Sequence, residues 1–332
     1  MPQDTNKVFS IKNTASQLTN KETTIIHLGM KKIAFSLLIA IIAFNTYAQD
    51  ISATKVFLID PSKTAEAIQT VHGPHVAIYN KAVTSTHKLF LMIVGTGGFA
   101  TETRGMDSII AGMGYHAISI DYKNTVITTV CNNSPDSACF DKFRQEIMFG
   151  TPVSDSVNVD SANCIINRVQ KLLLYLVKND PSGGWGEFIK KNDIQWGKIV
   201  VGGHSQGAGH SAFIAQHFKV SRALIFSGPQ DYRVAFHSPA LWLSRKSVTP
   251  PSKYFAFLHI NDPYDVTRQL ANCSTLMHTP MPDSISVKPG VPIITSKHIL
   301  VNDISKGDPH MSTLLPEFKN VWEYMLNADI AK

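Results

Sequence analysis

The sequence predicts an α/β fold in which a mostly parallel central sheet is flanked by helices. Three observations predict this class. Short runs of β-branched and apolar residues alternate with helix-like patterns along most of the 332 residues. The first two runs are too close together for a helical crossover, which favours an antiparallel edge. The later runs are almost wholly apolar, as in strands that are buried on both faces.

The expected strands are short and lie between residues 55 and 301. They cover Lys55–Ile59, His75–Tyr79, Leu89–Val94, His116–Asp121, Lys198–Val201, Ala223–Phe226, Tyr254–Ile260 and His298–Val301. We expect the first two to form the antiparallel edge and the later ones to lie at the centre of the sheet.

Three helices are expected among these strands. The clearest runs from Ser161 to Lys178, where apolar residues recur at helical spacing before Asn179-Asp180-Pro181 marks its end. A second helix should start after Ser205. A third is expected from Ser312 to Leu326, with Pro316 in its first turn.

Two irregular excursions interrupt this alternation, at 123–160 and 229–252. The first contains a short helix, and the second is rich in proline and contains Trp242. Excursions of this kind at strand ends often shape binding sites. We see no internal repeat and no dividing linker, so the sequence predicts one domain with insertions after the middle and late strands.

The N-terminus has the pattern of a secretory signal. Two lysines precede an apolar run at 33–44, and small residues follow up to Ala48. The run is shorter than the roughly 20 residues that span a bilayer, so we expect cleavage after Ala48 and no stable membrane span. The chain therefore divides into an N-terminal extension at 1–29, a signal peptide at 30–48 and a mature domain at 49–332. We expect translation to start at Met30 and the product to be periplasmic or extracellular.

Composition and charge exclude several classes of protein. With 44% hydrophobic and 9% aromatic residues, the chain has the apolar area that disordered proteins lack. Its formal charge is +6, but residues 1–48 hold five lysines and only two acidic residues, so the mature charge is +3. Such a thinly spread excess gives no reason to expect a nucleic-acid partner.

The mature region contains four cysteines, an even number that suggests disulfides in an exported chain. Cys131 and Cys139 flank a polar segment that a local bridge would close. Cys164 and Cys273 are the candidates for a second bridge, although four cysteines allow three pairings and buried free thiols are the alternative. Their spacings do not form a convincing zinc-ligand set, so no metal site is expected.

The clearest chemical signal is Gly203-His204-Ser205-Gln206-Gly207, which follows a buried strand and precedes a helical run. A serine in such a tight strand–turn–helix connection needs small residues two positions before and after it, and its hydroxyl is then presented above the sheet. Ser205 is therefore the candidate nucleophile. The structural alternative is a glycine-rich turn with a capping serine.

In this motif and its context the sequence resembles the α/β-hydrolase superfamily, and in particular its secreted esterase and lipase-like members. The resemblance covers about His75 to Leu326. It implies a catalytic triad in the order serine, acid, histidine, with the last two on loops after late strands. The same parts are required on chemical grounds, because a serine hydroxyl is a weak nucleophile without a base that a carboxylate orients.

For the acid, Asp262 directly follows the strand that ends near Ile260 and matches the position that the resemblance implies. Asp265 and Asp231 are the alternatives, and each could also serve in an ordinary turn. For the base, His310 lies in a loop between the last strand and the last helix. His278 comes too early, and His298 begins an expected strand.

An oxyanion hole needs two backbone donors that converge on the developing negative charge. The amide of Gln206 is one candidate. The other is expected from the segment after the strand Leu89–Val94, with Gly97, Gly98 and Phe99 as alternatives. A phosphate loop is the rival interpretation, but this segment lacks the Lys-Ser/Thr that a P-loop requires.

These residues predict an exported serine hydrolase that cleaves carboxylic esters through an acyl-enzyme and needs no metal or organic cofactor. Trp242 is expected to wall an apolar substrate pocket, with a place in the cover of the core as the alternative, and His204 is expected to pack beside the nucleophile. The substrate is expected to be a small-molecule or polymer ester. Lipase, polyester depolymerase, carbohydrate esterase and peptidase activities use the same parts. A non-catalytic binding or adhesion protein on the same scaffold is the alternative from another class.

Overall fold

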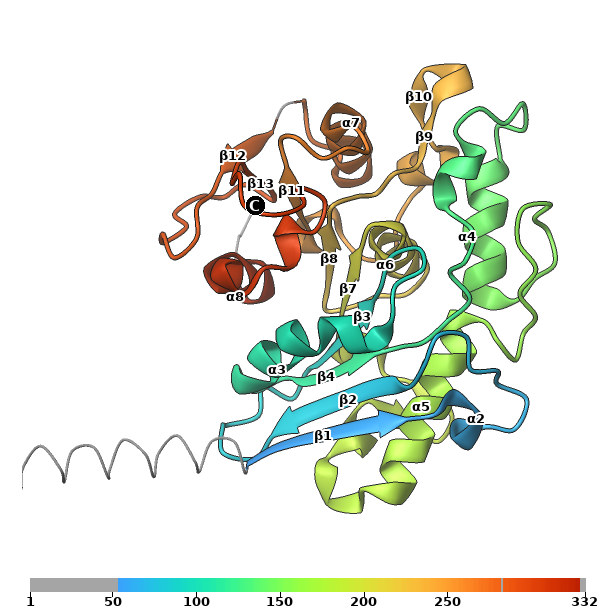
Figure 1. The fold of residues 1–332 in the computed structure, drawn as a ribbon, viewed down its shortest axis with the longest axis vertical. Coiled ribbons are helices and arrows are strands. Elements are labelled where there is room, and N and C mark those ends of the chain that lie inside the picture. Colours follow the sequence, from blue (N-terminus) through green and yellow to red (C-terminus); the bar gives the residue numbers. More distant parts are fainter. Residues whose placement is uncertain (1–52, 282, 329–332) are drawn as a thin grey trace, which may run out of the picture. The chain divides into compact units, whose positions relative to one another are not determined.

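A nine-stranded sheet forms the centre of the molecule in the computed structural model, which describes residues 53–281 and 283–328 (Figure 1). The predicted extension at 1–29 and signal peptide at 30–48 lie outside the described residues. The strand order is β1-β2-β4-β3-β7-β8-β11-β13-β12. Their bounds are β1 Thr54–Ile59, β2 His75–Asn80, β3 Leu89–Ile93, β4 His116–Ser119, β7 Ile199–His204, β8 Arg222–Phe226, β11 Tyr254–His259, β12 Ser284–Ser286 and β13 Ile299–Asn302.

The sheet is parallel except at one edge. β1 pairs antiparallel with β2, and β2 pairs antiparallel with β4, while every other neighbouring pair is parallel. The predicted α/β class and antiparallel edge are therefore confirmed. β12 was not predicted, because its three residues Ser-Ile-Ser carry too short a pattern. Two small hairpins lie outside the sheet: β5 Ile189–Lys190 with β6 Asp193–Ile194, and β9 Tyr232–Arg233 with β10 Ser238–Pro239.

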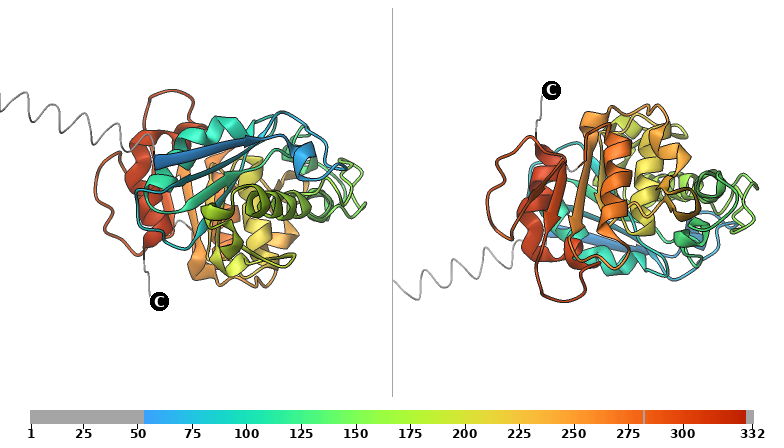
Figure 2. Two further views of the ribbon diagram at one scale, coloured as in Figure 1. Left: turned by 90° about the horizontal axis from the view of Figure 1, so that it is seen from below. Right: turned by 90° about the horizontal axis from the view of Figure 1, so that it is seen from above.

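Helices cover both faces of the sheet (Figure 2). One face packs against α3 Arg104–Gly112 and α8 Lys319–Asn327. The other packs against α4 Cys139–Phe149, α5 Ile165–Asn179, α6 Gln206–His217 and α7 Val266–Met277. A single turn of helix, α2 Pro61–Thr64, contacts α5. The alternation of side chains along the strands divides the buried residues into these two layers.

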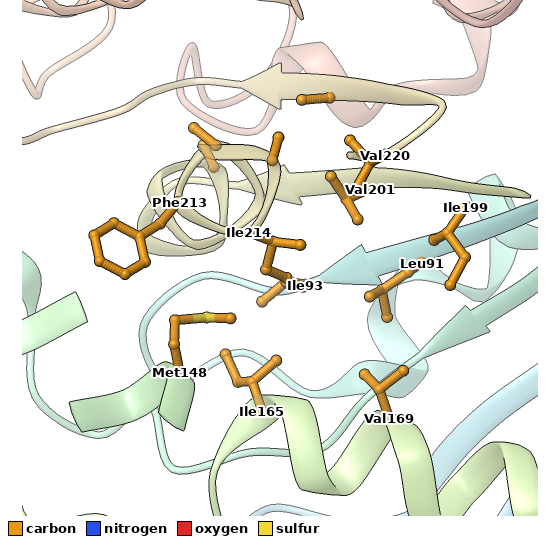
Figure 3. Packing of buried hydrophobic residues seen from close by; sticks show 14 of the residues in the cluster. Leu91, Ile93, Met148, Ile165, Val169, Ile199, Val201, Phe213, Ile214 and Val220 are labelled. Atoms are coloured by element: carbon orange, nitrogen blue, oxygen red, sulfur yellow. The ribbon is translucent and has the colours of Figure 1, made fainter. Parts of the chain in front are cut away.

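Figure 3 shows the larger of the two layers beside β3 and β7. Leu91 and Ile93 from β3 lie opposite Ile165 and Val169 of α5, while Ile214 of α6 fills the space beside them. All five side chains are fully buried. This packing fixes the central strands, whose carboxyl ends carry the candidate site.

The C-terminal helix begins later than the sequence predicted. Ser312–Leu314 and Pro316–Phe318 form short 3-10 turns, and α8 starts only at Lys319. Proline restricts the residue before it to extended backbone, and Leu315 accordingly has ψ 134°. α5 also starts late, at Ile165, because Cys164 is extended.

The cysteines divide into one bridge and two thiols. Cys131 and Cys139 form a disulfide as expected. The predicted Cys164–Cys273 bridge is wrong, since both are buried free thiols. Cys164 lies at the start of α5 and donates to Ser161 O, whereas Cys273 lies in α7 and donates to Gly228 O. Both thiols are therefore held in separate helices by separate backbone acceptors.

Among residues 53–281 and 283–328, no helix is both long enough and apolar enough to cross a membrane.

Candidate active site

Ser205 occupies a strained turn at the carboxyl end of a central strand. It connects β7 directly to α6, with φ 58° and ψ −119°. A Cβ on Gly203 would lie 2.0 Å from the carbonyl oxygen of Gly207, and one on Gly207 would lie 2.0 Å from that of Ile93. The turn thus requires glycine at both positions. A strained serine of this kind, between strand and helix, is the geometry of a nucleophile elbow.

The elbow lies within a mostly parallel sheet that has helices on both faces. The fold is that of the α/β hydrolases. In α/β hydrolases the nucleophile works with an acid and a histidine from later loops, so the positions of those candidates decide what this site can do.

His310 and Asp262 meet beside the elbow. The Nδ1 of His310 hydrogen-bonds to Oδ2 of Asp262 at 2.8 Å, and the carboxylate is fully buried. Burial by itself raises the pKa of Asp262, but the hydrogen bond and charge of His310 and the amide of Tyr264 hold this pKa below its usual value. Asp262 is therefore an ionised acceptor that fixes the imidazole orientation.

The main chain at His310 is held by two hydrogen bonds to its carbonyl oxygen. Its carbonyl oxygen accepts hydrogen bonds from Nε2 of His204 at 2.9 Å and from the hydroxyl of Ser227 at 2.7 Å. Burial, followed by the nearby His310, lowers the pKa of His204 to about 4. His204 is therefore neutral at physiological pH and supports the loop that carries His310.

Ser205 and His310 line one pocket of about 320 Å³. Its other lining residues are Val94, Gly95, Thr96, Gly98, Glu102, Thr103, His204, Tyr264, Met311, Leu314 and Leu315. Nε2 of His310 is buried and has no hydrogen-bond partner among the described residues. Oγ of Ser205 accepts a hydrogen bond from Nε2 of Gln230 at 3.1 Å.

The two alternative acids have other partners. Asp265 caps α7 through the amide of Arg268 and pairs with that arginine. Asp231 is fully buried and forms a two-point contact with Arg144, at 3.0 and 2.5 Å. Of the three carboxylates, Asp262 is the one that contacts His310.

The backbone amides of the glycine loop that were predicted as candidate oxyanion donors already have acceptors. The amide of Gly97 donates to Asn124 O, that of Gly98 to Gly95 O, and that of Phe99 to the carboxylate of Glu102. All three predicted donors are thus already engaged within or beside the loop.

Two residues near this loop have roles that the sequence did not predict. Thr96 lines the pocket, and its amide donates to no backbone acceptor among the described residues. Its hydroxyl donates to the side chain of Gln206 at 2.6 Å. Asn124 holds the loop, because its Nδ2 donates to the carbonyl oxygens of Gly95 and Gly98. No sequence pattern marks either role.

The amide of Gln206 remains a candidate oxyanion donor. Gln206 is the first residue of α6, and the first amides of a helix have no intrahelical acceptor. The side chain of Gln206 is fully buried, so the residue is fixed beside the nucleophile.

Of the two predicted substrate-binding residues, His204 lines the pocket and Trp242 does not. Trp242 is fully buried, makes an edge-to-face contact with Phe213 and donates a hydrogen bond from Nε1 to Asp231 at 2.8 Å. Its assignment as a pocket wall is therefore wrong. The excursion that carries it turns its largest apolar side chain into the core.

Comparisons with known proteins give structural neighbours only. No protein-family model matches the sequence, and a search of curated proteins finds no significant match. The chain is similar to an inhibited esterase B from Lactobacillus rhamnosis, with 11% identity and a TM-score of 0.45 over 86% of this chain and 92% of that one. It is also similar to an alpha-beta serine hydrolase homologue from Coxiella burnetii, with 12% identity and a TM-score of 0.43 over 82% and 95%.

Proposed function

We propose that this α/β hydrolase cleaves carboxylic esters through an acyl-enzyme on Ser205. The observation that carries the proposal is the buried Asp262–His310 pair, which shares one pocket with a strained serine at the end of β7. A carboxylate that orients a histidine beside a serine is the arrangement that activates a hydroxyl nucleophile.

In the proposed reaction, Nε2 of His310 accepts the proton of Ser205 as Oγ forms a bond to the ester carbonyl carbon. The imidazolium then gives this proton to the leaving alcohol, and the acyl group stays on Oγ. Water, deprotonated by His310, attacks the acyl carbon and releases the carboxylic acid, while Oγ recovers its proton. Asp262 stays ionised and stabilises the imidazolium in both halves.

The amides of Gln206 and Thr96 are proposed as the oxyanion donors. Gln206 follows the nucleophile at the start of α6, and Thr96 lies on the opposing loop within the pocket. This assignment replaces Gly97, Gly98 and Phe99, whose amides have acceptors of their own. Preorganised donors of this kind stabilise the negative charge that forms in the transition state.

The pocket favours a small or medium acyl or aryl group. A volume of about 320 Å³ is at the lower end of ligand sites. Tyr264, Met311, Leu314 and Leu315 supply apolar lining, and Thr96, Glu102 and Thr103 supply polar lining. Small-molecule esters or the chain ends of a polymer ester fit this description.

Export to an oxidising compartment is part of the proposal. The apolar run at 33–44 has the pattern of a signal peptide. The Cys131–Cys139 disulfide supports export, because such bonds persist outside the cytosol.

A series of p-nitrophenyl esters of increasing acyl length tests this function, with the 49–332 chain and its Ser205→Ala variant. We expect the native chain to hydrolyse short esters best and the variant to be inactive. Hydrolysis by Ser205→Ala at the native rate would refute the proposal. A rate that jumps when the substrate forms an emulsion would instead assign the site to lipids.

A further inference from the structure

Gln230 is a buried side chain that contacts the nucleophile. Its Nε2 donates a hydrogen bond to Oγ of Ser205 at 3.1 Å, and only 5% of the residue is exposed. It follows β8 by four residues, in the first turn of the excursion at 229–252. The triad described above gives it no role.

The backbone around Gln230 is fixed on several sides. The next residue, Asp231, is held by two hydrogen bonds from Arg144 and one from Nε1 of Trp242. The preceding carbonyl, of Pro229, accepts a hydrogen bond from Asn272 of α7. The backbone on both sides of Gln230 is therefore fixed by contacts other than Ser205.

Arg144 connects the backbone segment around Gln230 to the turn at Ser205. Its guanidinium donates to the carbonyl oxygen of Gln206 at 2.7 Å while it holds Asp231. A Cβ on Gly209 would lie 2.0 Å from Arg144 Nη2, so α6 has room for this arginine only because a glycine stands there. One buried ion pair thus positions both the segment that bears Gln230 and the helix that follows Ser205.

A glutamine is an unfavourable choice here for stability alone. Its Oε1 is buried and has no partner among the described residues. Burial of an unpaired amide oxygen costs free energy, whereas an apolar side chain of similar size would incur no such cost. Residues that break a local rule in this way tend to lie at functional sites.

We propose that Gln230 is a further catalytic residue, whose amide donates to Ser205 Oγ throughout the reaction and stabilises the charge that develops on this atom. The inference rests on the proposed function. During acylation Oγ passes its proton to Nε2 of His310 and uses one lone pair to attack the carbonyl carbon. The Gln230 donor stays on another lone pair and keeps Oγ oriented.

The same contact acts when the acyl group departs. In deacylation the bond from the acyl carbon to Oγ breaks, Oγ leaves with the electron pair, and the His310 imidazolium returns the proton. A hydrogen-bond donor on Oγ favours this leaving group. Since the donor acts on the nucleophile and not on the acyl chain, its loss should slow all esters by the same factor.

The test compares Gln230→Met, which keeps the length of the side chain and removes the donor, with Gln216→Met. Gln216 is an equally buried glutamine that donates to Trp242 O, away from the pocket. For Gln230→Met we expect kcat to fall roughly 10-fold with KM little changed. Labelling by a fluorophosphonate should slow by a similar factor. Gln216→Met should keep the native kcat, and its melting temperature should be similar to that of Gln230→Met.

A second variant keeps the shape of the side chain. Gln230→Glu places a carboxylate against Oγ, where it accepts the serine proton in competition with His310, so kcat should fall further than in Gln230→Met. Native kcat and labelling rate in either folded variant would overturn the inference, and so would a loss in KM alone. Ser205→Ala separates the two proposals: if it is inactive while Gln230→Met is fully active, only the role of Gln230 fails.

Discussion

Three carboxylates follow the late strands, and their partners distinguish them. Asp262 contacts His310, Asp265 caps α7, and Asp231 neutralises Arg144 inside the core. The sequence could order these candidates by position only, because each lies after a strand in a turn-forming context. What separates them is tertiary contact, which no local pattern records.

Asp262→Asn should leave the fold intact and reduce kcat by about 10³–10⁴-fold, because an amide favours the wrong imidazole tautomer and does not stabilise the imidazolium. Steady-state hydrolysis of a short ester measures this effect. Asp265→Asn is the matched control, since it changes a carboxylate three residues away that contacts α7 and not His310. Equal losses in the two variants would contradict the assignment of Asp262.

The residues predicted from the sequence were those whose roles depend on chain order. Ser205, Asp262 and His310 follow predicted strands, and the structure brings the last two into contact beside the first. Trp242 was misassigned because apolar character does not reveal whether a side chain faces a pocket or the core. Thr96 and Gln230 were missed because an amide or carboxamide donor has no sequence signature.

At the scale of elements, the elbow depends on close packing between β3, β7 and α6. Its two glycines lie where a Cβ would overlap a carbonyl oxygen of Gly207 or Ile93. This explains why the motif could be recognised from sequence, since the steric requirement is local. The start of α8 could not be predicted equally well. The helical pattern of apolar residues continues through Pro316, but the backbone there forms a 3-10 turn and the α-helix begins only at Lys319.

Gly203→Ala should displace the elbow, because the added methyl group has no space. We expect a large loss of stability and no activity. Thermal unfolding and ester hydrolysis measure the two effects. Gly105→Ala in α3 is the control: its Cβ would meet no atom within 4 Å, so stability should not fall. A stable, active Gly203→Ala variant would show that the turn tolerates a side chain.

The Cys131–Cys139 disulfide closes a small loop within the first excursion, with a sequence separation of 8. Within this loop the carbonyl oxygen of Asn132 accepts hydrogen bonds from the amides of Val234 and Ala235, so the bridge also supports the second excursion. A double Cys131→Ser and Cys139→Ser variant should lose about 2–3 kcal/mol of stability. Denaturant unfolding measures the loss, and a dithiothreitol-treated native chain should match the variant.

Across the whole molecule, buried histidines make stability depend on pH. Burial lowers the pKa of His75 to about 3 and of His204 to about 4, and that of His210 well below its usual value. The unfolded chain binds protons at these sites from about pH 6.5 downward, while the folded chain does not.

The contribution of these histidines is therefore fully present above about pH 6.5 and is lost as the pH falls toward 4. Denaturant unfolding at a series of pH values, at constant ionic strength, should show a falling free energy of unfolding over this range. His75→Gln should flatten the decline, because it removes one of these buried imidazoles. A flat profile in the native chain would contradict the burial of these side chains as neutral groups.

The sheet order, the two helical layers and the pocket together support the proposal that Ser205 is the nucleophile of an esterase. Fluorophosphonate labelling followed by intact-mass and peptide analysis tests it most directly. We expect one adduct per chain, on Ser205, formed together with loss of ester hydrolysis and absent from Ser205→Ala. An adduct on another residue, or full hydrolysis after Ser205 is modified, would contradict it.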